Sequence, residues 1–142
     1  MARRSEIDMT DALGSGPVID VQVGLQKAAV ADLVTKGLPV PPTVAIRMQV
    51  DTGATNCVLV PSVIKALALQ PVSRGTASSP NAHNVPVLMY AVTLYTPVGS
   101  FEETVMAVVL PGQNIQGLIG RTLLQAGCFT YDGKKSSFVL EF

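Results

Sequence analysis

Short stretches of alternating apolar and polar residues, together with a few fully apolar runs, make up most of the chain. Between residues 44 and 50, Val, Ile, Met and Val alternate with Ala, Arg and Gln, which predicts a half-buried β-strand. Helical spacing is confined to residues 26–36 and 61–67 and to one turn at 121–125. The remaining predicted strands lie at 17–25, 57–60, 85–95, 101–110, 118–119, 128–131 and 138–142. Many short strands with few helices indicate a mostly β fold, closed or sandwich-like.

The composition is that of a single domain with a sizeable apolar core. Of 142 residues, 48% are hydrophobic and 14% are charged. Because no apolar run reaches the roughly 18–20 residues that a membrane span needs, we expect no membrane contact. The 10 Lys and Arg residues balance the 10 Asp and Glu residues without forming a basic stripe, so nucleic acid is not an expected partner.

The first 16 residues are polar and end in Gly-Ser-Gly, which predicts a flexible tail at 1–16 before a single domain at 17–142. Because no apolar stretch follows the basic start, we expect no secretory signal and a cytoplasmic location. Cys57 and Cys128 lie in apolar stretches, and in a reducing compartment we expect buried free thiols rather than a disulfide. Two cysteines and one histidine provide no metal-ligand set of useful spacing.

Asp51 stands at a place suited to chemistry. It directly follows the predicted strand at 44–50, and Thr52 and Gly53 allow the backbone to turn tightly and to hydrogen-bond the carboxylate. The apolar run at 57–60 follows the turn. This setting would hold the acid rigidly at the floor of a cleft, where poor solvation can tune its affinity for a proton.

Asp51-Thr52-Gly53-Ala54 resembles the active-site signature of aspartic proteases. Residues 117–124, Gly-Leu-Ile-Gly-Arg-Thr-Leu-Leu, resemble the second signature of the retropepsin branch, and the two motifs have the expected order and spacing. The resemblance covers roughly residues 40–142. It implies a closed, retropepsin-like β-barrel with an extra N-terminal helix at 26–36, and an aspartic endopeptidase that requires no metal or organic cofactor.

The resemblance also implies roles for the residues of the active-site loop. Asp51 would be the catalytic acid, and Thr52 would link the two loops of a dimer through its hydroxyl. Gly53 would allow close approach of the substrate and present its carbonyl to the peptide. Ala54 and Thr55 would line the first substrate subsites.

The second motif is expected to support this loop from beneath. Gly120 would let the backbone pass tightly under the loop, with Leu118 and Ile119 packed behind it. Arg121 lacks its familiar partner, because the position that carries a carboxylate in viral enzymes is Thr55 here. We therefore expect Arg121 to be structural rather than to face substrate.

Residues 73–84 are rich in small and polar residues and lie between strand-like segments. By position they match the flap hairpin that closes over substrate in this family, although an ordinary mobile surface loop would have the same composition. As a flap, the segment would contact substrate through residues at its tip: Ser79, Pro80, Asn81, Ala82 and His83.

Peptide hydrolysis by this route needs two carboxyl groups that face each other across one water. The sequence contains one Asp-Thr-Gly triplet and no internal repeat, and Asp20, Asp32 and Asp132 lack the Thr-Gly sequel. The second carboxylate must therefore come from another copy of the chain. This predicts an obligate homodimer with the site on its two-fold axis, acting on a peptide or protein substrate.

Two other functions fit parts of the pattern. A protease-like dimer that binds peptides, with weak or lost catalysis, would carry the same residues. Cleavage that is blocked by Asp51→Asn would separate the enzyme from such a binder. The pattern Asp51-x-Gly53-x-Thr55 also fits a phosphate-binding turn of actin-like ATPases, but that fold needs a longer chain, a second phosphate loop and an adenosine motif.

Overall fold

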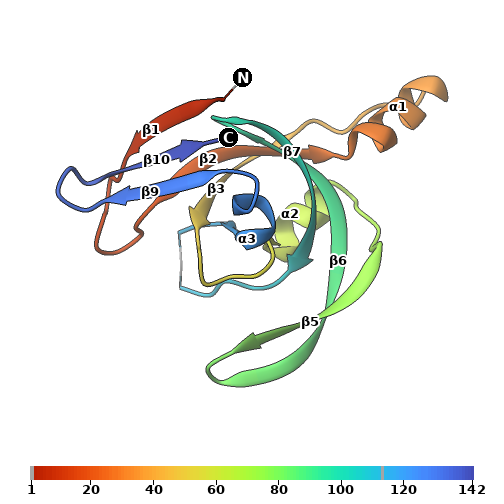
Figure 1. Ribbon diagram of the computed structural model, residues 1–142. Coiled ribbons are helices and arrows are strands. Elements are labelled where there is room, and N and C mark those ends of the chain that lie inside the picture. The colour runs from red at the N-terminus through yellow and green to blue at the C-terminus, as the bar shows by residue number, and fades with distance from the viewer. Residues whose placement is uncertain (1, 113) are drawn as a thin grey trace.

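Six strands of a computed structural model close into a barrel (Figure 1). The structure describes residues 2–112 and 114–142. Pairing of β2 with the end of β6 closes the ring, and this confirms the predicted mostly β, closed architecture. The strand order around the barrel is β2 (Val18–Leu25), β3 (Val44–Val50), β8 (Gly117–Ile119), β4 (Val58–Leu59), β7 (Gly99–Ala107) and β6 (Ala82–Thr96).

The core of the barrel follows from the alternation of the sequence. In β3, Ile46, Met48 and Val50 point inwards and are each 5% exposed or less, whereas the residues between them are half-buried or exposed. Val21 and Val23 of β2 continue the same apolar interior. The predicted strands at 17–25 and 44–50 are confirmed, because the buried face of each repeats every second residue.

Two short helices follow β4 and β8 and bury side chains in the core. Helix α2 (Pro61–Ala66) begins with a proline at its first position, where a missing N–H costs nothing. Helix α3 (Arg121–Leu124) follows β8 and buries Leu123. Both lie where the sequence predicts helical turns.

Strand β5 (Ser73–Ser79) pairs with the first half of β6, and this hairpin extends beyond the barrel (Figure 1). Its turn joins Ser79 to Ala82, and a register irregularity lies between Ala77 and Ser79. Asn84 adopts a left-handed conformation with φ 53°, and its N–H donates to the Ser78 hydroxyl at 3.0 Å. The segment at 73–84 is therefore a two-stranded hairpin.

A second sheet of three strands joins the two ends of the chain, in the order β1 (Arg4–Asp8), β10 (Ser137–Glu141) and β9 (Cys128–Asp132). The expected flexible tail at 1–16 is wrong for residues 4–8, which form β1; residue 1 lies outside the described residues. Ile7 is half-buried and Met9 is 7% exposed, so this segment contributes to the core despite its polar composition.

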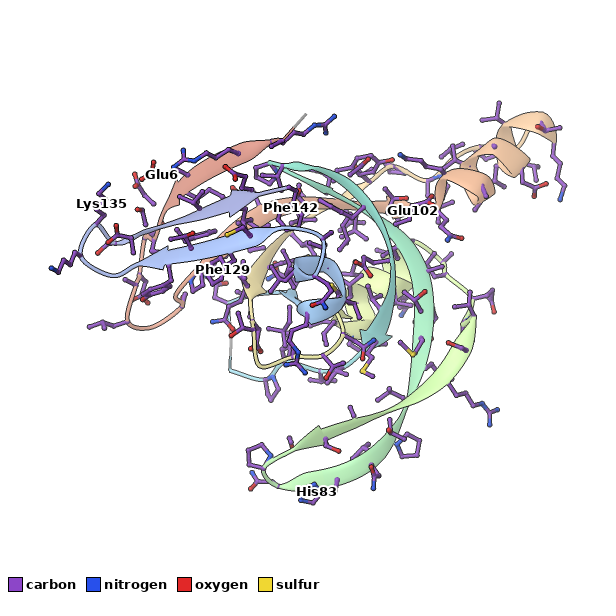
Figure 2. The ribbon with its side chains drawn as sticks, viewed as in Figure 1. Glu6, His83, Glu102, Phe129, Lys135 and Phe142 are labelled. Carbon is purple, nitrogen blue, oxygen red and sulfur yellow. The ribbon has the colours of Figure 1, made fainter. Side chains whose placement is uncertain are left out.

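Helix α1 (Lys27–Thr35) projects away from the barrel, as Figure 1 shows, and all nine of its residues are exposed or half-buried. Its first N–H, that of Lys27, donates to the Glu102 carboxylate at 2.9 Å. Glu102 lies at the base of the helix (Figure 2). Among the described residues, no helix has the length and apolar character needed to cross a membrane.

Candidate active site

The loop that carries Asp51 is positioned by a crossing of strands. Strand β8 lies between β3 and β4, so the chain that leaves β3 must pass over the end of β8 to enter β4. The N–H of Asp51 donates to the Ile119 carbonyl at 2.9 Å, which continues the β3–β8 pairing for one more residue. The Asp51 side chain accepts a hydrogen bond from the Gly53 N–H at 2.9 Å, which fixes the orientation of its carboxylate.

The second motif lies directly beneath this loop. The N–H groups of Arg121 and Thr122 donate to the carbonyls of Ala54 and Thr55 at 2.9 and 3.0 Å. A Cβ atom at Gly120 would lie 2.5 Å from the carbonyl carbon of Asn56 and 3.0 Å from the Ala54 oxygen. Only a residue without a side chain fits in this space, so Gly120 determines how closely β8 and the loop pack.

Arg121 contacts the loop through two uncharged groups. Its Nη1 atom donates to the Thr52 carbonyl at 2.8 Å, and its Nη2 atom donates to the Thr55 hydroxyl at 3.1 Å. The sequence offered no carboxylate partner for this arginine, and the structure supplies a backbone oxygen and a hydroxyl instead. These contacts hold the loop on both sides of Gly53.

A cleft of about 640 Å³ opens between the loop and the β5–β6 hairpin. Asp51 is the one acid among its lining residues, on the loop side together with Gly53, Ala54 and Thr55. Thr52 is exposed, and its carbonyl accepts the hydrogen bond from Arg121 of the second motif. The other walls are formed by Asn56, Val58, Thr76, Ala77, Ser78, Ser79, Met106, Val108, Val109, Leu110 and Leu118.

The predicted flap residues separate into two groups. Ser79 lines the cleft, and Ala82 lines an adjoining apolar pocket of about 320 Å³ beneath the hairpin. Pro80, Asn81 and His83 are exposed at the hairpin end, where Figure 2 shows His83 far from the barrel. Closure of the hairpin would be needed to bring these three residues to a substrate.

Sequence reasoning missed part of the cleft wall. Val108, Val109 and Leu110 follow β7 and line the cleft, and Val109 is 66% exposed. The sequence gives one indication of this wall, because the predicted strand at 101–110 ends in an apolar run that continues beyond its alternating part. A fully apolar run, however, does not indicate which of its residues face solvent.

The thiol behind the loop is inert. Burial raises the pKa of Cys57 to about 11, and the Thr122 hydroxyl donates to its sulfur at 3.9 Å. Burial also raises the pKa of the neighbouring Glu103 carboxyl. Since a nucleophilic cysteine needs an accessible thiolate, Cys57 is a packing residue. The expectation of a buried Cys128 is wrong, because it begins β9 at the edge of its sheet and is exposed.

The site thus presents one oriented carboxylate, set in a largely apolar cleft. A carboxylate can take a proton from water, but a second group must protonate the leaving atoms. In the described part of the chain, no three His, Cys, Asp or Glu side chains gather closely enough to hold a metal ion.

Comparison with known proteins agrees with this geometry. The family model described as "gag-polyprotein putative aspartyl protease" matches residues 43–126, more than half of the chain. A retropepsin-like aspartic protease from Rickettsia conorii is similar in structure, with a TM-score of 0.60 and 16% identity over 100% of this chain and 92% of that one. EIAV protease, complexed with the inhibitor HBY-793, has a TM-score of 0.51 and 18% identity over 78% of this chain and 86% of that one.

None of the curated proteins matches the chain. The two solved structures share its fold, and the family model covers both the Asp51 loop and the motif around Gly120. The predicted resemblance is confirmed: this chain belongs to the gag-polyprotein aspartyl protease family and has a retropepsin-like fold.

Proposed function

We propose that this protein is an aspartic endopeptidase that works as a homodimer. The observation that carries the proposal is the position of Asp51, whose carboxylate is oriented by the Gly53 N–H at the floor of a cleft roofed by a hairpin. The family match supports a hydrolase of this kind. A cleft of about 640 Å³ between the loop and the hairpin has room for several residues of a peptide.

Two Asp51 carboxyls, one from each protomer, would face each other across a water. Because two like charges cannot be held close together cheaply, the pair would carry one proton. The ionised carboxylate takes a proton from the water as its oxygen attacks the scissile carbonyl. The protonated carboxyl donates its proton to the carbonyl oxygen as negative charge builds there. The carboxyl that took the water's proton then donates it to the nitrogen, one hydroxyl of the tetrahedral intermediate returns its proton to the other carboxylate, and the C–N bond breaks to release the amine.

The dimer is supported by what one protomer lacks. Asp51 is the one acid among the residues that line the cleft, so a single chain supplies the base without the acid. The exposed Thr52 hydroxyl is available to bond the partner's loop. A two-fold axis beside the loop would bring in the second carboxyl and would also place the Thr52 hydroxyl against the partner's loop.

The walls of the cleft indicate the substrate class. Met106, Val108 and Leu118 offer apolar surface, and the adjoining pocket is lined by alanines, valines and two serines. We expect cleavage between apolar residues, because burying apolar side chains there releases water. A peptide library cleaved mainly beside charged residues would contradict this specificity.

The expected pH range follows from the shared proton. Activity should be highest in the acidic to mildly acidic range, where the pair of carboxyls carries one proton. A rate that still rises at alkaline pH would indicate a different mechanism. We also propose a cytoplasmic location, which the exposed free thiol of Cys128 supports, since such thiols persist in reducing compartments.

A peptide-library assay with wild type and Asp51→Asn tests the proposal. The variant keeps the shape of the loop but cannot act as a base, so cleavage should fall to background. Asp20→Asn, which changes an exposed acid on the outer face of β2, is the matched control and should retain wild-type activity. Peptide binding without cleavage by wild type would favour the alternative of a protease-like binding module.

A further inference from the structure

Strand β7 carries an acid on the face that the barrel turns inwards. Phe101, Glu103 and Val105 share this face, because side chains alternate along a strand. Val105 is 0% exposed, and so is Val92, which pairs with Glu103 across the sheet. A carboxyl group in this row breaks the apolar alternation that builds the core. Breaks of this kind occur at functional sites, where a side chain serves the reaction rather than packing.

The Glu103 side chain meets the second motif behind the active-site loop. Helix α3 packs against β7 (Figure 1), and the Thr122 hydroxyl of this helix donates to the half-buried Glu103 carboxylate. The same hydroxyl lies 3.9 Å from the sulfur of Cys57. Burial and then the charge of Glu103 raise the pKa of the Cys57 thiol, so the carboxylate and the thiol are also close to each other. Three polar side chains from three separate segments therefore meet here.

Thr122 has one hydroxyl hydrogen for its two neighbours. An ionised carboxylate only accepts hydrogen bonds, and it is a stronger acceptor than sulfur. When Glu103 is ionised, the hydrogen therefore goes to the carboxylate, and the hydroxyl oxygen accepts from the Cys57 thiol instead. When Glu103 is protonated, its carboxyl donates to Thr122, which then donates to the sulfur. The carboxyl thus holds the Thr122 side chain in both states.

Thr122 connects this contact to the active-site loop. Its N–H donates to the Thr55 carbonyl at 3.0 Å. Arg121, the residue before it, donates to the Thr52 carbonyl and the Thr55 hydroxyl. The first turn of α3 must therefore keep its position if the guanidinium is to reach both acceptors. Since Asp51 directly precedes Thr52, a shift of this turn would also shift the catalytic carboxylate.

Strand β7 also forms part of the cleft wall. Met106, which follows Glu103 on this strand, lines the cleft, and its N–H donates to the Cys57 carbonyl at 3.0 Å. From this point β7 pairs in parallel with β4. Glu103 therefore joins the helix that carries Arg121 to the strand that carries the cleft wall.

We infer that Glu103 is a positioning residue for the proposed reaction: its carboxyl holds Thr122, and through Thr122 it fixes the Asp51 loop against the cleft wall. This inference rests on the proposed function, because it assigns a role in that same site. The fold itself gains little from the acid, since burial raises the pKa of the Glu103 carboxyl and so disfavours its charged form. An acid that merely ends in solvent could be replaced without any effect on catalysis.

Glu103→Leu separates positioning from folding. Leucine suits an inner face between Phe101 and Val105, so the free energy of unfolding should stay at or above that of wild type. Because the Thr122 hydroxyl loses its acceptor, kcat should fall about 10-fold or more while KM changes by less than about 2-fold. Glu103→Gln keeps an acceptor oxygen and should recover most of this loss. Glu102→Gln changes the neighbouring acid on the outer face of β7, and as the matched control it should keep wild-type kcat.

Thr122→Val, which removes the hydroxyl and keeps the shape of the side chain, tests the contact itself. In the double variant with Glu103→Leu, kcat should be no lower than in either single variant, because both changes remove one interaction. Burial raises the pKa of Glu103 and the Thr122 hydroxyl lowers it, so its carboxyl titration, followed by carbon NMR, should have a higher midpoint in Thr122→Val than in wild type. Losses of kcat that multiply, or an unchanged midpoint, would overturn the inference.

The outcomes separate this inference from the proposed function. If Asp51→Asn is inactive while Glu103→Leu keeps wild-type kcat, the role of Glu103 is wrong and the dimeric protease stands. If wild type cleaves no peptide, the proposed function fails, and the inference fails with it. If Glu103→Leu is less stable than wild type, Thr122→Val decides, and wild-type kcat in that variant would overturn the inference. A folded Glu103→Leu protein with lowered kcat, together with recovery in Glu103→Gln, supports both.

Discussion

Replacing Gly120 with alanine should remove the close contact on which the active-site loop depends. Gly120 has φ −94° and ψ −177°, an extended conformation that alanine adopts readily. The substitution therefore adds no backbone strain and tests only whether there is room for a methyl group. The new Cβ would lie 2.5 Å from the Asn56 carbonyl carbon, whereas ordinary contact begins at 3.4 Å. The Asn56 carbonyl oxygen would lie closer still, so the loop must move by at least about 0.9 Å, the difference between these distances.

This displacement has two costs. Overpacking against backbone that cannot rotate away costs about 1–3 kcal/mol. The hydrogen bonds from Arg121 and Thr122 to the loop carbonyls, at 2.9 and 3.0 Å, would weaken, at roughly 0.5–1.5 kcal/mol each. The free energy of unfolding should fall by about 2–6 kcal/mol. A shift of about 1 Å at Asp51 should also lower kcat/KM by about 100-fold.

Urea unfolding at a fixed protein concentration measures the first effect, because the stability of a dimer depends on concentration. Cleavage of a peptide under conditions where the variant stays folded measures the second. Gly133→Ala is the matched control, since its Cβ would meet only a Tyr131 ring carbon at an ordinary 3.5 Å. A Gly120→Ala protein with the stability and kcat/KM of wild type would refute the role given to this glycine.

Further predictions concern the arginine and the two thiols. Arg121→Ala should lower kcat more than it raises KM, because the Thr52 carbonyl and the Thr55 hydroxyl lose their donor. Arg121→Lys should recover part of the lost activity. Equal activity of wild type and both variants would contradict this role. A thiol reagent should modify Cys128 in the native protein and Cys57 only after unfolding; rapid modification of both would contradict the burial of Cys57. Burial raises the pKa of Cys57 from 9.0 to about 11, so the folded state favours the neutral thiol. The free energy of unfolding should therefore be intact below pH 9 and fall by up to about 3 kcal/mol as the pH rises to 11. Cys57→Ala should not show this fall.

The parts of the fold that the sequence predicts are those in which the pattern is local. Apolar and polar residues alternate along β3, and Thr52 and Gly53 directly after Asp51 favour the tight turn that the loop makes. Helix α1 is found almost where helical spacing predicts it, at Lys27–Thr35 against the predicted 26–36. The local pattern of each segment is enough to predict its structure, although β3 and the loop also contact β8 and Arg121 in the fold.

The features that sequence reasoning missed depend on partners far along the chain. Strand β1 looks like a polar tail until its pairing with β10, at the opposite end of the chain, is known. The acceptors of Arg121 are a backbone carbonyl and a hydroxyl, and a carbonyl has no signature in a sequence. Cys128 lies in an apolar segment, but β9 is an edge strand and leaves it exposed.

Mixing wild type with Asp51→Asn at constant total protein tests the shared active site most directly. If each site needs Asp51 from both protomers and the two proteins exchange freely, activity should follow the square of the wild-type fraction. An equal mixture would then retain about one quarter of the activity, since only one pairing in four is wild type on both sides. Sedimentation of the variant alone confirms that it dimerises as wild type does. Activity that falls in proportion to the wild-type fraction, to about one half in the equal mixture, would show that one chain suffices and would contradict the proposal.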